Sequence, residues 1–531
     1  MNTIKYFCIQ KNRKHFFVVF FFSLLAVNLI QAQHQNILIS DRLNEYEPNE
    51  PSVVINPVNT NEILVGSNND NYFYSTDAGY TWTHRVLHSP HTVLCDPCVL
   101  VDGHSQFYYC HLVYDITGVV CQKAETIDSQ FNDGTFVTRD ITKDNDKEWA
   151  VYDREREIIY LTWAEFDVHG SMNPSHRSRI LFTKSIDQGE TWTTPVIISD
   201  IDGNAAGGNY SDHGPMPEYG PNGEVYVVWW GPQGLMMDIS TDFGETWLQN
   251  DMNILGEHIT WLPDIPGIEV APSFLIIKCD RSNGPNRGTL YINWCDQING
   301  TSDTDVWLIK STDGGTTWGD RIRVNNDPPS LSKHQFYSWM DIDQTNGHIY
   351  IMFYDRRNYS GNQTDVYLAF SSGGSRFSNT KISESPFTPL NSYPFGHYNA
   401  LSAHNGVVRP VWTRQNNGRL QLMTAIVDVS AVTGVNEIET DNIPLEFGIS
   451  SVYPNPFNPS AKIIYHINEP GDVKLSLYDA LGRKIKNLFS AFLSPGDYEY
   501  ELVSGDLASG VYYITLETKN DINSKKIMCL K

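Results

Sequence analysis

Several sequence motifs that mark common reaction classes are missing from this chain of 531 residues. It has no Gly-rich phosphate-binding loop, no Gly-x-Ser-x-Gly turn and no His-Glu-x-x-His motif. These absences exclude nucleotide binding, α/β-hydrolase chemistry and zincin-type zinc chemistry. An EF-hand-type loop is also absent, although clustered oxygen atoms of an acidic exported protein can bind calcium in other ways. We therefore expect no cofactor and leave calcium open.

Positive charge is scarce, with 38 lysine and arginine residues against 62 aspartate and glutamate residues and a formal net charge of -24. Cleavage of the leader described below removes four positive charges and no negative ones, which brings the net charge to about -28. A surface of this sign repels nucleic acid and anionic membranes, so we expect neither as a partner.

Long apolar runs are limited to one, at residues 16–30, near the N-terminus. This run follows four basic side chains and precedes the small residue Ala32. Because it is short for a membrane span, a cleaved signal peptide over residues 1–32 is favoured over an uncleaved anchor. We expect no membrane span in the mature chain and a monomeric protein.

Cysteine is sparse as well, with eight residues, of which one lies in the leader. Export makes disulfides permissible. Cys110 and Cys121 flank a turn between two strand-like runs, and Cys279 and Cys295 are placed in the same way. Either pair can therefore bridge neighbouring strands.

Cys95 and Cys98 have the spacing of a redox motif, but no helix or βαβ unit surrounds them. Zinc is the weaker alternative, because no second pair stands at finger spacing. We expect structural roles for all four cysteines between residues 95 and 121.

The chain does contain a repeat. The pattern Ser-x-Asp-x-Gly-x-Thr-Trp occurs four times, at residues 75–82, 185–192, 240–247 and 311–318. Around each copy lie short runs rich in β-branched and aromatic residues, separated by Gly, Asn and Asp. Four such strands per repeat form one blade of a β-propeller, so the sequence predicts an all-β fold.

Inner strands of the blades can be counted along the chain. They start near Ser52, Cys98, Glu148, Pro215, Ala271, Tyr337 and Tyr398. This count predicts a seven-bladed propeller, or a six-bladed one if one of these strands is an insertion. The last repeat lacks its fourth strand, which residues 36–40 (NILIS) resemble. We expect this N-terminal strand to complete the last blade and so remove exposed sheet edges.

The repeated motif resembles the Asp-box, or bacterial neuraminidase repeat, so residues 33–430 look like a propeller of the sialidase superfamily. In that family the motif forms the turn between the third and fourth strands of a blade. The resemblance implies a structural role for its aspartates, whose side chains can accept backbone N–H groups within the turn. These residues are Asp77, Asp187, Asp242 and Asp313.

The C-terminal part differs in character and reads as a small β-sandwich at residues 450–531, after a linker at residues 431–449. It resembles the C-terminal sorting domain of the type IX secretion system in the runs YPNPF (453–457), LYDALGR (477–483) and LASGVY (507–512). The resemblance implies export by the type IX machinery to the surface of a Gram-negative, Bacteroidetes-type bacterium or into the medium.

A propeller brings the residues that enter its inner strands close to the axis at one end, which we call the entry end; the Asp-box turns fall at the other. By their position before the inner strands, the residues at the entry end include Glu50, Asp96, Lys147, Tyr337 and Tyr398, with His213 and His397 one residue before such positions. The loops between second and third strands add charged side chains there. We expect the functional site at this end.

Sialidase chemistry, as the resemblance implies it, needs an arginine clamp, a tyrosine nucleophile beside a carboxylate, and an acidic proton donor. The catalytic candidates are Tyr398, Glu50 and Asp96. The candidates for the clamp are Arg42, Arg356, Arg357 and Arg414. These residues predict a secreted glycoside hydrolase that acts on an anionic sugar of a glycan, although the Arg-Ile-Pro motif of sialidases is absent.

Two other functions stay open. A polysaccharide lyase or uronate-directed glycosidase would use a histidine or tyrosine as acid and base, and His213, His334 and His397 are available. A non-catalytic glycan-binding propeller would use aromatic platforms. The candidates for these platforms are Trp163, Trp229, Trp230, Trp294 and Trp412.

Overall fold

The computed structural model describes residues 34–41, 48–256, 261–329, 331–389, 395–433, 447–453, 455–468, 471–493, 496–505 and 507–530. The chain divides into two compact units, Met1–Val435 and Asn436–Lys531, each of which is described by itself below. The predicted signal peptide at residues 1–32, Arg42 and residues 434–446 of the predicted linker lie outside the described residues.

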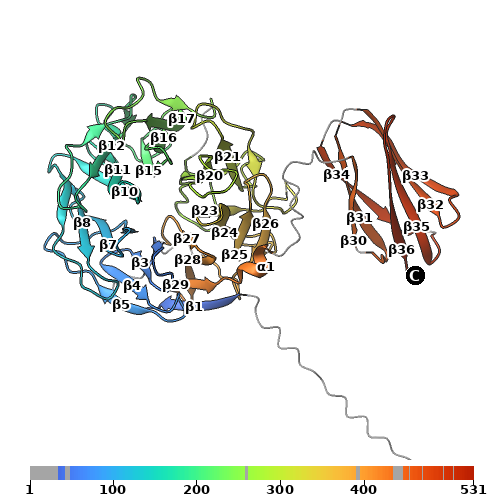
Figure 1. Ribbon diagram of the computed structural model, residues 1–531, viewed down its shortest axis with the longest axis horizontal. Coiled ribbons are helices and arrows are strands. Elements are labelled where there is room, and N and C mark those ends of the chain that lie inside the picture. The colour runs from blue at the N-terminus through green and yellow to red at the C-terminus, as the bar shows by residue number, and fades with distance from the viewer. Residues whose placement is uncertain are drawn as a thin grey trace, which may run out of the picture. The chain divides into compact units, whose positions relative to one another are not determined.

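Antiparallel sheets form a ring in the first unit (Figure 1), and all but the last are built from consecutive strands. Among the described residues of this unit there are seven such sheets, one for each predicted inner strand, and the short strand β14 is added to the third. The strands of the first three sheets are β2 (Ser52–Ile55), β3 (Ile63–Ser67), β4 (Asn71–Ser75), β5 (Thr83–Val86), β6 (Cys98–Val101), β7 (Phe107–Leu112), β8 (Gly118–Ala124), β9 (Thr135–Arg139), β10 (Asp144–Asp153), β11 (Ile158–Phe166), β12 (Arg177–Ser185), β13 (Val196–Ile197) and β14 (Gly203–Asn204).

The next three sheets repeat this order. Their strands are β15 (His213–Tyr219), β16 (Val225–Gly231), β17 (Gly234–Ser240), β18 (Met252–Asn253), β19 (Ile276–Cys279), β20 (Leu290–Asp296), β21 (Asp305–Ser311), β22 (Ile322–Arg323), β23 (Gln335–Asp343), β24 (His348–Asp355), β25 (Asp365–Ser371) and β26 (Ser378–Lys381). Their second and third strands are almost wholly buried, as expected for sheets that pack face to face around an axis.

The seventh sheet closes the ring with both ends of the unit. It contains β27 (Ala400–His404), β28 (Val407–Asn416), β29 (Arg419–Ile426) and, as its outer strand, β1 (Gln35–Ser40). Residues of β1 pair antiparallel with β29, from Gln35 opposite Ile426 onward. The prediction that the N-terminal strand completes the last sheet is therefore confirmed. The short helix α1 (Val429–Thr433) follows.

The four repeated turns share one hydrogen-bond pattern. Asp77 accepts the backbone N–H of Thr81 at 2.9 Å and the threonine hydroxyl at 2.7 Å, while Ser75 Oγ accepts the N–H of Gly79 at 2.8 Å. Asp187, Asp242 and Asp313 make the same bonds in their own turns. The hydrogen bonds from its threonine lower the pKa of Asp242 to about 2. The carboxylate oxygens of these aspartates are therefore engaged in hydrogen bonds within their own turns.

The second unit consists of two sheets around a core of its own, including Ile463, Leu475 and Ile514. One sheet has the order β30-β31-β34 and the other β33-β32-β35-β36. The bounds are β30 (Gly448–Tyr453), β31 (Ser460–Ile467), β32 (Gly471–Asp479), β33 (Lys484–Leu493), β34 (Gly496–Val503), β35 (Gly510–Glu517) and β36 (Ile522–Cys529). This arrangement is the small β-sandwich predicted from the strand pattern.

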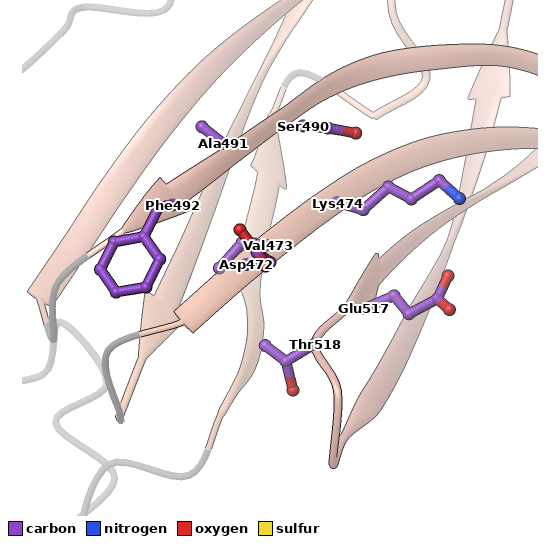
Figure 2. A pocket seen from close by; sticks show the side chains of 8 residues that line it. All are labelled: Asp472, Val473, Lys474, Ser490, Ala491, Phe492, Glu517 and Thr518. Atoms are coloured by element: carbon purple, nitrogen blue, oxygen red, sulfur yellow. The ribbon is translucent and has the colours of Figure 1, made fainter.

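A shallow hollow of about 520 Å³ lies on the second unit between β32, β33 and the end of β35. In Figure 2, Phe492 stands at one end of this hollow, and Lys474 and Glu517 lie at the other. No helix in the described part of the chain is long and apolar enough to span a bilayer.

Two expectations are wrong at the level of side chains. Cys279 lies opposite Leu290, and Cys295 lies opposite Val306, so Cys279 and Cys295 do not face each other. The cause is the register of the β19–β20 hairpin. The tryptophans considered as sugar platforms are all buried and cannot stack on a ligand; they are Trp163, Trp229, Trp230, Trp294 and Trp412.

Candidate functional site

Five of the seven inner strands have a residue with positive φ near or just before the start of their pairing. The values are 48° at Glu50, 56° at Asp96, 52° at Lys147, 56° at Gly214 and 52° at Tyr337. In β10, β15 and β23 this residue lies within a register shift, which is the signature of a β-bulge. Bulges redirect a side chain out of the regular alternation of a strand, and in β10 the bulge accompanies the turn of Lys147 toward Glu50 and Asp96.

Lys147 holds two carboxylates at the axis. Its Nζ lies 2.5 Å from Oδ1 of Asp96 and 3.1 Å from Oε2 of Glu50. All three residues are buried, with exposed fractions of 7%, 4% and 5%. A buried charge of one sign requires compensation, so the lysine is what allows two acids to share this space. The sequence analysis placed Lys147 with Glu50 and Asp96 among the residues before the inner strands but predicted no role for it.

The two carboxyls differ in their proton affinity. Burial raises the pKa of Asp96 to about 7, and the neighbouring Glu50 adds to this rise against the opposing effect of Lys147. Burial also acts to raise the pKa of Glu50, but Lys147 and His397 outweigh it and hold that pKa well below its ordinary value. Glu50 is therefore the anion of the pair, and Asp96 is the member that carries a proton below neutrality.

His397 is the exposed part of this cluster. Its Nδ1 lies 3.0 Å from Oε1 of Glu50, and its side chain is 39% exposed. Glu50 and His397 line a cavity of about 200 Å³ at the entry end. The other residues lining it are Asn49, Asn68, Gly267, Ile268, Glu269, Val270, Phe395 and Gly396. We call this space the entry cavity.

Two loops form the walls of the entry cavity, and one hydroxyl ties them together. The OH of Tyr337 lies 2.8 Å from the carbonyl oxygens of both Val270 and Gly396 and shares its one hydrogen between them. Gly396 has a φ of 92°, and a Cβ there would lie 3.1 Å from Cβ of Asn49 and 3.2 Å from Cγ of Glu50. The loop before the seventh sheet thus needs a glycine to bring His397 against Glu50.

Tyr398 lies beneath the carboxylates, among aromatic rings. Its OH is 3.4 Å from Oδ1 of Asp96, and its ring contacts Trp149, Phe274 and Trp339 at centroid distances of 5.3, 5.3 and 5.8 Å. Burial, with the nearby Asp96 and Glu50, raises the pKa of Tyr398 well above its ordinary value. The structure brings Tyr398, Glu50 and Asp96 together as predicted, but Tyr398 does not line the entry cavity.

The described arginines of the predicted clamp lie apart from the entry cavity. Arg357 binds Asp355 at 2.6 Å and stacks on Tyr367 at 4.3 Å. Arg414 donates to Gln421 at 2.9 Å. Both guanidinium groups are therefore engaged by other side chains.

Arg356 has a different environment. It is 3% exposed, and burial lowers the pKa of its guanidinium to about 10. Its Nη1 donates to the carbonyl of Pro266 at 2.6 Å and its Nε to Thr364 at 3.1 Å. Its Nη2 has no hydrogen-bond partner in the described part of the chain. Through Pro266, Arg356 anchors the loop that continues into the cavity wall at Gly267.

The other two predicted histidines, His213 and His334, are buried. His213 stacks on Trp261 at 5.3 Å, and burial lowers its pKa to about 4. His334 pairs through Nδ1 with Thr304 at 2.9 Å, and burial, helped by Arg356, lowers its pKa to about 4 as well. Neither lines the entry cavity.

A second cavity, of about 350 Å³, lies at the opposite end of the axis. Trp149 and Trp339 line it and also contact Tyr398, which places an aromatic layer between the two cavities. Charged residues at this end include Lys278, which is 3.3 Å from Asp341. The described residues contain no group of three metal-ligating side chains at either cavity or elsewhere.

Comparison with known proteins identifies the second unit. Residues 451–530 match the family described as "Secretion system C-terminal sorting domain". The prediction of a type IX sorting domain is confirmed, and it places the protein at the cell surface or in the extracellular space. Nothing about the reaction follows from it.

The first unit has more distant relatives. A xyloglucanase of Paenibacillus sp is 27% identical over 221 residues, which is 40% of this chain and 19% of that protein, so the match spans about a fifth of its length. Similar solved structures include the NanB sialidase of Streptococcus pneumoniae, with a TM-score of 0.42, 9% identity and coverage of 69% and 83% of the two chains.

Two further structures have comparable scores. The Trypanosoma rangeli sialidase has a TM-score of 0.43 at 11% identity, with coverage of 93% and 89%. A polysaccharide lyase, an ulvan lyase, has a TM-score of 0.44 at 11% identity, with coverage of 73% and 95%. At these scores the likeness identifies no reaction.

Proposed function

We propose that the propeller processes glycans, and that it hydrolyses a glycosidic bond by proton transfer at the entry cavity. The observation that carries this proposal is the 3.0 Å contact between Nδ1 of His397 and Oε1 of Glu50. A carboxylate on one ring nitrogen fixes the orientation of an imidazole and leaves the other nitrogen free to exchange a proton with a ligand. Lys147 keeps the carboxylate anionic for that purpose.

The lining of the entry cavity suits a ligand rich in hydroxyl groups. Asn49, Asn68 and Glu269 offer amide and carboxylate groups beside the His397–Glu50 pair. Such convergent polar groups in a small concave site fix the orientation of a polar ligand. The relative named a xyloglucanase also points to a glycan.

Hydrolysis is favoured over elimination because two carboxylates face the same cavity. Glycosidases divide proton donation and water or sugar activation between two carboxyl groups. Glu50, through His397, and the exposed Glu269 supply two acid–base groups on different walls of the entry cavity. We assign proton transfer to His397. Glu269, on the opposing side of the glycosidic bond, is the second acid–base group.

A sialidase-type reaction on an anionic sugar is the second candidate. It is favoured by the contact of Tyr398 with Asp96 and by the unpartnered Nη2 of buried Arg356. In this scheme Tyr398 is the nucleophile and Arg356 binds the sugar carboxylate. The scheme requires the aromatic layer to open toward the ligand.

The mature full chain, incubated with xyloglucan, a sialoside and a uronate-rich polysaccharide, tests these proposals. New reducing ends support hydrolysis, free sialic acid supports the second candidate, and new absorbance from an unsaturated uronate indicates a lyase. Binding on a glycan array with no product from any substrate would overturn the enzymatic proposal in favour of a binding module.

A histidine variant assigns the site. His397→Gln is expected to lower kcat by about 10²–10⁴-fold with little change in binding, because an acid–base group is lost. His404→Gln, at the opposite end of the axis, is the matched control and should retain the full rate. Equal rates for both variants would contradict the assignment of His397.

A further inference from the structure

Three cysteines form a row across the second sheet. Cys98 of β6 lies opposite Cys110 of β7, which lies opposite Cys121 of β8. Residues opposite each other project to the same face of a sheet. All three are buried, with exposed fractions of 2%, 0% and 3%. The central thiol therefore has two neighbours with which it can pair.

The hydrogen-bond ladder distinguishes these two neighbours. Val113 donates its N–H to the carbonyl of Gly118 at 3.1 Å, which makes this a hydrogen-bonded pair of β7 and β8. Pairs of an antiparallel ladder alternate, and the register from there to Cys110 and Cys121 is unbroken. Counting back three positions makes Cys110–Cys121 a non-hydrogen-bonded pair. Side chains approach most closely in such pairs, with Cα atoms about 4.5 Å apart, which lies within disulfide range.

The pair of Cys110 with its other neighbour, Cys98, is of the opposite type. Asp102 donates its N–H to the carbonyl of Gln106 at 3.0 Å, and the register from there to Cys98 and Cys110 is also unbroken. Counting back four positions makes Cys98–Cys110 a hydrogen-bonded pair, whose Cα atoms stand about 5.5 Å apart. Both Cα distances lie within disulfide range, so the closer approach of the side chains in the non-hydrogen-bonded pair is what favours Cys121.

Existing contacts of the thiols agree with this assignment. Sγ of Cys98 accepts the N–H of Ala150 in the third sheet at 3.3 Å and lies 3.9 Å from the carbonyl of the same residue. Cys110 and Cys121 lie opposite each other on adjacent strands. Cys98 is thus held by the neighbouring sheet, which leaves Cys121 as the partner of Cys110.

We propose that Cys110 and Cys121 form a disulfide in the exported protein, and that Cys98 remains a thiol. Export carries the chain through an oxidising compartment, where such bonds persist. One thiolate attacks the disulfide of an oxidised thiol–disulfide exchange protein, and the second thiolate then displaces that protein. Each cysteine loses one proton, the two sulfurs lose two electrons, and the exchange protein is released with two thiols.

The burial of both sulfurs sets the order of events. Because neither is accessible in the folded protein, the bond is expected to form before the third sheet covers the second. Once formed, it should resist reductant in the folded protein and be reduced readily only in denaturant.

Thiol counting on the exported, mature full chain tests the proposal. Alkylation in denaturant without reductant should label two fewer cysteines than after reduction, and peptide mapping should recover residues 110 and 121 in one cross-linked species. Cys98→Ser should retain this cross-link, and Cys121→Ser should lose it. Labelling of all cysteines without reductant, or a cross-link that includes Cys98, would overturn the proposal.

Discussion

The Nζ atom of Lys147 lies 3.1 Å from Oε2 of Glu50, although the two residues stand 97 positions apart in the chain. The same nitrogen binds Asp96, which directly precedes the second sheet. The charge balance of the entry end therefore depends on one lysine.

Replacement of that lysine is expected to be costly. Lys147→Met leaves two buried carboxyls without a cation, and breaking a buried pair in this way costs about 3–5 kcal/mol. Urea unfolding at neutral pH measures the loss, and the loss should shrink at acidic pH, where the carboxyls become neutral. Lys123→Met is the control, because its partner Glu190, at 2.9 Å, is 57% exposed; it should cost at most about 1 kcal/mol. Equal losses in the two variants would contradict the role of Lys147.

Asp96 predicts a pH dependence of stability. Its pKa is about 7 in the folded protein against an ordinary value of 3.8, so the folded state keeps a proton that the unfolded state has released. The free energy of unfolding therefore falls as pH rises through this window, by at most about 1.4 kcal/mol per pH unit. In Asp96→Asn this decline should disappear, so the stability of the variant relative to the parent should improve from about pH 4 to about pH 7. Unfolding curves across this range decide the matter, and parallel pH profiles would rule out Asp96 as the titrating group.

The position of Gly396 beside Glu50 leads us to expect that turnover depends on the conformation of the loop before the seventh sheet. The backbone of Gly396 has a φ of 92°, and the methyl group of Gly396→Ala would press against Asn49 and Glu50. This contact should displace His397, so that kcat falls while KM changes little. Gly418→Ala is the control, since its φ is 76° and no atom lies within 4 Å of an added Cβ. In both variants the alanine must adopt a left-handed backbone conformation, which lowers the free energy of unfolding by about 1–2 kcal/mol. Only Gly396→Ala should lose activity, and a matching loss in Gly418→Ala would assign the effect to backbone strain alone.

The repeat made the fold predictable from the sequence. A turn motif that recurs beside strand-like runs predicts the sheets, and the unpaired last repeat predicts that residues 36–40 join it. The alignment of Glu50, Asp96 and Tyr398 before their strands predicted that these residues meet. Local pattern was sufficient because each sheet repeats one geometry.

Properties that depend on contacts between sheets were not predictable. Nothing in the run around Lys147 distinguishes a buried cation from a surface one, because its carboxylate partners lie just before two other sheets. The sequence around Arg356 likewise gives no sign of its hydrogen bond to Pro266, which lies 90 residues away. The separation of Cys279 from Cys295 depends on hairpin register, which strand patterns do not define.

Tyr398 separates the two enzymatic schemes. Tyr398→Phe keeps the ring between Trp149 and Phe274 and removes one hydrogen bond of 3.4 Å, so stability should fall by about 1 kcal/mol or less. If His397 and Glu269 act on the ligand, turnover should persist, because the phenol does not line the entry cavity.

Loss of all turnover in a folded Tyr398→Phe protein would instead favour the tyrosine nucleophile of the sialidase scheme. Tyr337→Phe is the informative comparison, since its hydroxyl joins both cavity walls through Val270 and Gly396. It should raise KM and lower kcat even though Tyr337 touches no ligand, because the two loops lose their common hydrogen-bond donor. Turnover measured on the substrate that gives product, together with urea unfolding of each variant, separates a chemical role of a phenol from a positioning role.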